Sequence, residues 1–141
     1  MPERQAVDAD GVHLGTEDLP VAAARRIAPD MIIGASSHTR DEFERAQTDG
    51  ASYVNIGPVF ETKTKHWEGA YLGLAGVQDI SQVARVPFTV MGGIKSEHIP
   101  ALISAGARTI ALVTAVSGAD SPRDAAQALC DLVAHHRELC A

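Results

Sequence analysis

Five short apolar segments recur along the chain and predict β-strands. They are residues 12–15, 31–34, 53–57, 88–92 and 109–113. Most of them are apolar on both faces, which is typical of strands covered on both sides in a parallel sheet. Four of the five end in glycine, so a change of backbone direction is expected at the carboxyl end of each of these strands.

Helical patterns separate the predicted strands. Thr39 and Glu42 form a capping box that predicts a helix from about Arg40 to Asp49, and Ser121 precedes Pro122 in the manner of another helix start. The remaining helical patterns cover residues 20–27, 76–84 and 96–105. Strands that alternate with helices, without hairpin signals, predict an α/β fold with a parallel sheet in one domain, residues 1–141.

Two architectures fit this alternation. One is an open, doubly wound sheet, for which five strands are a normal number. The other is part of a (β/α)8 barrel, which needs eight units. The pattern of strands and helices alone does not decide between them.

Composition and charge narrow the possible partners. The chain has 141 residues, 45% of them apolar and 21% charged, and no apolar run approaches a membrane span. Its first ten residues lack the apolar core of a secretory signal, so we expect a cytoplasmic protein. The net charge of −6 argues against a nucleic-acid surface but allows a small anionic ligand. Cys130 and Cys140 lie about 15 Å apart if they share one helix, which predicts free thiols.

Polar residues follow the first two predicted strands. Asp18 stands just before Pro20 and is either a helix cap or a carboxylate ligand for Mg²⁺. Ser36 and Ser37 follow the second strand, and because Thr39 already fits the capping role, their hydroxyls are available to a phosphate.

The later strand ends indicate anion binding. Residues 62–65 read Thr-Lys-Thr-Lys, a local positive cluster in an acidic chain, and they lead into an irregular stretch that contains Trp67. Gly92 and Gly93 follow the fourth strand, and Thr114 follows the fifth. Paired glycines and a small hydroxyl after consecutive strands are similar to the phosphate-binding loops of many (β/α)8 barrels.

Together these segments resemble thiamine-phosphate synthase. The resemblance runs in order along nearly the whole chain, through GVHLGTEDLP (11–20), GASSHT (34–39), GPVF (57–60), TKTK (62–65) and GGI (92–94). It implies a (β/α)8 barrel, of which this chain would hold units 4–8, the five parallel strands alternating with helices. It also implies a transferase of thiamine biosynthesis that joins 4-amino-2-methyl-5-pyrimidinylmethyl diphosphate to thiazole phosphate and releases diphosphate.

The resemblance assigns a role to each candidate residue. Asp18 would bind Mg²⁺, Ser36 would lie near the diphosphate, and Lys65 would be the catalytic group that stabilises the departing diphosphate. Thr62 and Thr64 would surround the thiazole phosphate and the reacting groups, and Gly93, Val113 and Thr114 would hold the thiazole phosphate. The implied mechanism is dissociative, so charge stabilisation at the leaving group matters more than a protein nucleophile.

The chain also departs from the family pattern. The family carries three further strands before this region, with an Arg, a Lys and an Asn-Asp pair that serve the pyrimidine diphosphate and the metal. We therefore expect an N-terminally truncated barrel whose exposed strand edges could pair with a second copy of the chain. Two alternatives remain: a non-catalytic binder of phosphorylated thiazole, and a thiazole tautomerase in which His38 would do acid–base work.

Overall fold

The computed structural model describes residues 8–62 and 66–139 of the chain. The strands are β1 (Gly11–Leu14), β2 (Ile32–Ser37), β3 (Tyr53–Ile56), β4 (Phe88–Val90) and β5 (Thr109–Ile110). The helices are α2 (Val21–Ile27), α3 (Arg40–Thr48), α4 (Gly73–Val83), α5 (Ile99–Ser104), α6 (Thr114–Ser117) and α7 (Pro122–Leu139), with a 3-10 turn at Ser96–His98. The predicted alternation of strands and helices is confirmed.

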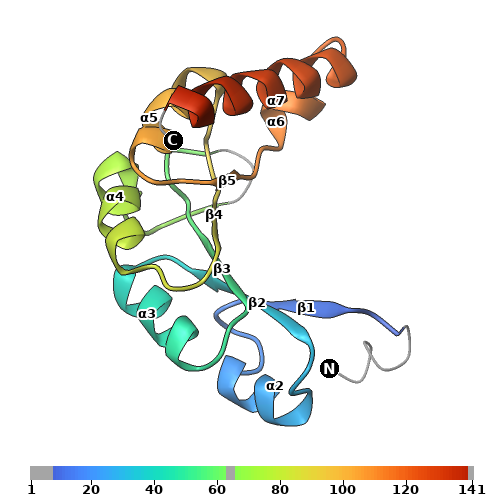
Figure 1. Cartoon of the computed structure of the whole chain (residues 1–141), viewed down its shortest axis with the longest axis vertical. Helices are drawn as coiled ribbons and strands as arrows, with labels where there is room; N and C mark the ends of the chain where they lie inside the picture. The colour runs from blue at the N-terminus through green and yellow to red at the C-terminus, as the bar shows by residue number, and fades with distance from the viewer. Residues whose placement is uncertain (1–7, 63–65, 140–141) are drawn as a thin grey trace.

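The sheet decides between the two architectures. All neighbouring strands pair in parallel and follow the chain in the order β1-β2-β3-β4-β5. A doubly wound sheet would reverse its strand order at a switch point. Figure 1 shows α2, α3, α4 and α5 following one another along one side of a curved sheet. A sequential order with helices on one side is the arrangement of a segment of a (β/α)8 barrel, as predicted.

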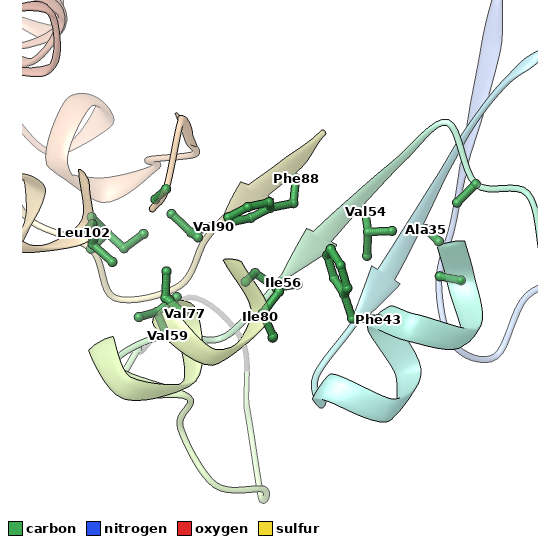
Figure 2. Packing of buried hydrophobic residues seen from close by; sticks show 14 residues of the cluster. Ala35, Phe43, Val54, Ile56, Val59, Val77, Ile80, Phe88, Val90 and Leu102 are labelled. Atoms are coloured by element: carbon green, nitrogen blue, oxygen red, sulfur yellow. The ribbon is translucent and has the colours of Figure 1, made fainter. Parts of the chain in front are cut away.

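The main core lies between the sheet and its helices. Phe43 of α3 meets Phe88 of β4 edge-on, with ring centroids 6.0 Å apart. Val77 of α4 and Leu102 of α5 are fully buried in the same cluster, and Figure 2 shows that its side chains come from separate elements. Burial of four such side chains stabilises the fold by roughly 6–12 kcal/mol before the conformational entropy cost.

The other side of the sheet is more open than the apolar strands suggested. Side chains alternate between the two sides along each strand, so Ile33 of β2 is fully buried while Ile32 is 52% exposed. In β3, Val54 and Ile56 are buried and the intervening Asn55 is only partly buried. The expectation that strands would be covered on both sides is therefore wrong for the described residues, because helices cover one side of the sheet.

Several element boundaries differ from prediction. Helix α4 begins at Gly73, three residues before the predicted start, and the predicted helix 96–105 is a 3-10 turn followed by α5. Strand β5 ends at Ile110, three residues before the predicted end, and the backbone then turns at Val113 (φ −118°, ψ −78°) into the unpredicted helix α6. The predicted start of α7 is confirmed, since Ser121 Oγ accepts the backbone N–H of Asp124 at 3.4 Å.

Helix α7 packs against α5 and α6 at one end of the molecule. Its Leu129 packs against Ile99 and Ile103 of α5. Cys130 on the same helix is exposed and free, as expected, whereas Cys140 lies outside the described residues. Within residues 8–62 and 66–139, none of the helices combines the length and apolar character needed to cross a membrane.

Candidate functional site

A cavity of about 280 Å³ lies at the carboxyl ends of β2, β3, β4 and β5. It is lined by residues from all four strand-to-helix connections, among them five to which the family resemblance assigned a role: Ser36, Thr62, Gly93, Val113 and Thr114. The carboxyl ends of parallel strands share one side of a sheet, so residues from separate units converge there. This convergence is the main structural support for a ligand site.

Three other nominated residues are not among the described residues that line the cavity. Thr64 and Lys65 lie outside the described residues. Asp18 is described, and it does not line the cavity.

Asp18 closes a turn and does not cap a helix. Its Oδ2 accepts the backbone N–H of Gly15 at 2.6 Å. Helix α2 has Pro20 at its N-cap position and no side-chain cap. The capping alternative is therefore wrong, and the exposed Asp18 carboxylate is held at the carboxyl end of β1 by the turn that it closes.

His13 connects β1 to the cavity, a contact that the sequence analysis missed. Its Nε2 lies 2.9 Å from Ser36 Oγ, and its Nδ1 lies 3.0 Å from the hydroxyl of Tyr53. Desolvation by the surrounding protein lowers the pKa of His13 below its usual 6.5, and the carboxylate of Asp18 opposes this shift. The sequence did contain a signal for this contact, because His13 is a polar residue inside an otherwise apolar predicted strand.

The two serines of β2 have different surroundings. Both line the cavity, but Ser36 is partly buried and contacts His13, whereas Ser37 is 1% exposed. The hydroxyl of Ser37 donates to the carbonyl oxygen of Asn55 at 3.4 Å. This contact across β2 and β3 gives Ser37 a structural role, so Ser36 is the better candidate for ligand contact.

His38 and Trp67 form one wall of the cavity. His38 Nδ1 lies 2.5 Å from the carbonyl oxygen of Gly57, and because a carbonyl only accepts, Nδ1 carries the proton. The remaining ring nitrogen, Nε2, is then the acceptor of the neutral side chain. The rings of His38 and Trp67 lie 4.5 Å apart between centroids.

Asn55 contributes an unpaired acceptor to the lining. Its Nδ2 lies 2.8 Å from the sulfur of Met91, and its Oδ1 is buried without a hydrogen-bond partner. Buried polar atoms without partners are rare. Sequence analysis did not nominate Asn55, because only the pairing of β3 with its neighbours shows which side of the sheet it faces.

The glycine pair joins the loops after β3 and β4. Gly92 and Gly93 have φ +94° and +65°, which only glycine adopts without strain. The backbone N–H of Phe60 donates to Gly92 O at 3.0 Å. A Cβ on Gly93 would lie 2.6 Å from Phe60 O, so this glycine is needed for the packing of the two loops.

The nominated residues Thr62, Gly93 and Thr114 also line a second, more open cavity of about 820 Å³. Its other lining residues include Lys95 and His98. Helix α6 begins at Thr114, directly after the backbone turn at Val113. The three shared residues thus form the boundary between the inner and the outer cavity.

Asp18 is the carboxylate that the sequence nominated for a divalent cation. No group of three or more His, Cys, Asp and Glu side chains within residues 8–62 and 66–139 is arranged to hold a metal alone. Mg²⁺ commonly uses one or two protein carboxylates together with substrate phosphates. Asp18 therefore fits Mg²⁺ as a partial site that a phosphorylated ligand would complete.

The model of one protein family, described as thiamine monophosphate synthase, matches residues 4–116. The chain belongs to this family. The chain is 39% identical over 129 residues to the thiamine-phosphate synthase of Methanococcus maripaludis, and 43% identical over 133 residues to that of Chloroflexus aurantiacus. These alignments cover 92% and 94% of this chain but 62% of each relative, so the chain spans less than two thirds of their length.

Structural comparison agrees with the family assignment. The solved thiamine phosphate pyrophosphorylase of Pyrococcus furiosus superposes with a TM-score of 0.82 at 37% identity. The match covers 94% of this chain and 63% of that structure. The resemblance drawn from the sequence motifs, and the barrel-type α/β fold it implied, are confirmed.

Proposed function

We propose that this chain acts in thiamine biosynthesis as part of a thiamine-phosphate synthase. It would join the pyrimidine diphosphate to thiazole phosphate, giving thiamine phosphate and diphosphate. The observation that carries the proposal is the convergence of Ser36, Thr62, Gly93, Val113 and Thr114 from four βα units on one cavity. The family membership of residues 4–116 supports the same reaction class.

In this proposal the thiazole phosphate lies at the boundary between the two cavities. Gly93 presents backbone there without a side chain, and Val113 and Thr114 lead into α6. Backbone N–H groups after the last two strands hold phosphate in many barrels of this type. Thr62 and Thr114 line both cavities and would add hydroxyl contacts.

The diphosphate would lie toward β1. Ser36 would contact it, and Asp18 would hold Mg²⁺ together with the diphosphate oxygens. When bound, the ion would neutralise charge that develops on the leaving group. His13 contacts Ser36 and is electrostatically coupled to Asp18, so it would fix the serine hydroxyl beside the metal-binding carboxylate.

Lys65 would supply the protein's own charge at the leaving group. This role rests on the family resemblance of the Thr62–Lys65 segment, as does the role of Thr64 near the thiazole phosphate. A cation that stabilises the departing diphosphate only in the transition state affects turnover more than substrate affinity. Loss of such a group commonly lowers the rate by about a hundredfold or more.

We also propose that the protein is cytoplasmic and that copies associate through strand edges. Within the described chain, β1 and β5 each pair with one neighbour only, and unpaired edges favour association. Analytical sedimentation tests this. A monodisperse monomer over a wide concentration range would argue against edge pairing.

The reaction is tested by incubating the protein with both substrates, with and without Mg²⁺, and measuring diphosphate release and thiamine phosphate. Turnover should require Mg²⁺. In an active preparation Lys65→Ala should reduce turnover about a hundredfold or more, and the neighbouring Lys63→Ala serves as the matched control. Comparable small losses in both variants would remove Lys65 from the mechanism.

A second candidate function is thiazole tautomerase, in which His38 would do the acid–base work. Its Nδ1–H is committed to Gly57 O while the ring lines the cavity, which leaves Nε2 to take or return a proton. Isomerisation of the thiazole that persists without Mg²⁺ and is lost in His38→Asn would favour this function over the synthase. Binding of thiazole phosphate without any turnover would instead identify a non-catalytic binder.

A further inference from the structure

Trp67 is the only tryptophan of the chain, and its indole forms part of the cavity wall. One part of the indole lies against His38, with ring centroids 4.5 Å apart and planes inclined by 45°. The side chain is only partly buried. A large aromatic surface is therefore available at the candidate site beyond its contact with His38.

Two local features hold the indole in place. Its Nε1–H donates to the carbonyl oxygen of Ala70 at 3.2 Å. A Cβ on Gly69 would lie 2.6 Å from Cζ2 of the indole, so the absence of a side chain at Gly69 lets the backbone pass close to the ring. An aromatic ring that is already positioned loses little conformational freedom when a ligand binds.

The described cavity wall has no charged side chain that could balance a positively charged ring. Its lining contains no Asp, Glu, Lys or Arg among the described residues. A cationic ring bound there would thus find no carboxylate in the described wall to balance its charge. The negative face of an aromatic ring attracts a cation within about 6 Å, and tryptophan provides the strongest such face.

We propose that Trp67 is the aromatic wall that receives the ligand's five-membered heteroaromatic ring and favours its cationic form. This rests on the proposed function, in which the bond formed at the thiazole nitrogen turns a neutral thiazole into a thiazolium cation. Trp67 would bind thiamine phosphate, which carries the thiazolium, more strongly than thiazole phosphate, which carries the neutral ring. It is a specificity-determining residue in this assignment and takes no part in proton transfer.

Titration calorimetry and tryptophan fluorescence test the proposal on the full chain. Because Trp67 is the only tryptophan of the chain, it is the source of the tryptophan fluorescence. Thiamine phosphate should quench this fluorescence, and inorganic phosphate should not. Trp67→Leu should weaken thiamine phosphate binding about tenfold and thiazole phosphate binding less, whereas Trp67→Phe should keep thiamine phosphate affinity within about threefold. Tyr71→Leu is the control, because Tyr71 is 42% exposed and does not line the cavity.

The possible results separate this proposal from the proposed function. Unchanged thiamine phosphate affinity in Trp67→Leu overturns the role of Trp67 and leaves the function intact. Equal weakening of both ring ligands overturns the preference for the cation. If Trp67→Leu does not fold, saturation of the wild-type protein without a fluorescence change overturns the proposal. Failure of the wild-type protein to bind either ring ligand overturns both the proposal and the function.

Discussion

Replacing Gly93 by alanine should destabilise the protein more than replacing Gly73, although the two glycines have similar φ angles. Their φ angles are +65° and +61°, in the left-handed region. A Cβ at Gly93 would lie 2.6 Å from the carbonyl oxygen of Phe60, while a Cβ at Gly73 would meet nothing within 4 Å. Because the obstacle at Gly93 is backbone, the loop after β3 must move to accommodate the new methyl group.

The two substitutions separate a conformational cost from a steric one. A non-glycine residue in the left-handed region costs about 1–2 kcal/mol, which is the expected loss for Gly73→Ala. Gly93→Ala adds an overpacking cost of about 1–3 kcal/mol, so its total loss should be about 2–5 kcal/mol. The effect of alanine on the unfolded chain, about 0.4–1 kcal/mol, is similar for both and cancels in the comparison.

Urea unfolding followed by far-ultraviolet circular dichroism measures the two losses of free energy. Calorimetric titration with thiazole phosphate measures their effect on the site, since Gly93 lines both cavities and Gly73 lines neither. Gly93→Ala should weaken binding and Gly73→Ala should not. Equal stability losses, or equal affinities, would refute the argument that close packing of the two loops shapes the site.

Arg25→Lys should lower the free energy of unfolding by about 2–3 kcal/mol, because the guanidinium donates to Gly50 O, Pro29 O, Met31 O and Ser52 Oγ, a set that a lysine ammonium cannot reproduce. The exposed neighbour Arg26→Lys should change it by less than about 0.5 kcal/mol in the same urea experiment, and similar losses in both variants would contradict a stabilising role of the Arg25 hydrogen bonds. Asp18→Asn retains an oxygen for the Gly15 N–H but removes the charge, so it should weaken Mg²⁺ binding in the presence of diphosphate by calorimetry; unchanged binding would exclude Asp18 as a ligand. Because desolvation lowers the pKa of His13 below 6.5, its stabilising contribution is fully present above pH 6.5 and decreases as the pH falls toward the lowered pKa. His13→Asn should flatten this part of the pH–stability curve, and an unaltered slope between pH 5 and 7 would exclude His13 as its source.

Much of the candidate site could be predicted because of a property of parallel sheets. Ser36, Thr62, Gly93 and Thr114 each follow a predicted strand, and the carboxyl ends of such strands lie on one side. Local sequence was therefore enough to bring them together without knowledge of the packing. The motifs also led correctly to the family, because their order along the chain matches it.

Residues within strands and in the long loop could not be found in the same way. His13 and Asn55 lie inside β1 and β3, and whether they face the helices or the open side depends on strand register and on which side the helices occupy. Trp67 belongs to an irregular stretch whose course depends on its contact with His38 and on the space at Gly69. The strand register and the contact with His38 are long-range relations that no local pattern encodes.

The sequence by itself determined the strands, the alternating helices and the residues available at each strand end, because periodicity, caps and glycines act over a few neighbouring residues. It also indicated an anion site through Gly93 and the threonines. Tertiary structure decided the sequential strand order, the placement of the helices on one side and the pairing of His13 with Ser36. It also changed the interpretation of Asp18, whose carboxylate closes a turn with Gly15 where a helix cap was one alternative. Such outcomes depend on contacts between segments that are distant in the sequence, and these contacts stabilise the protein only once the sheet has formed.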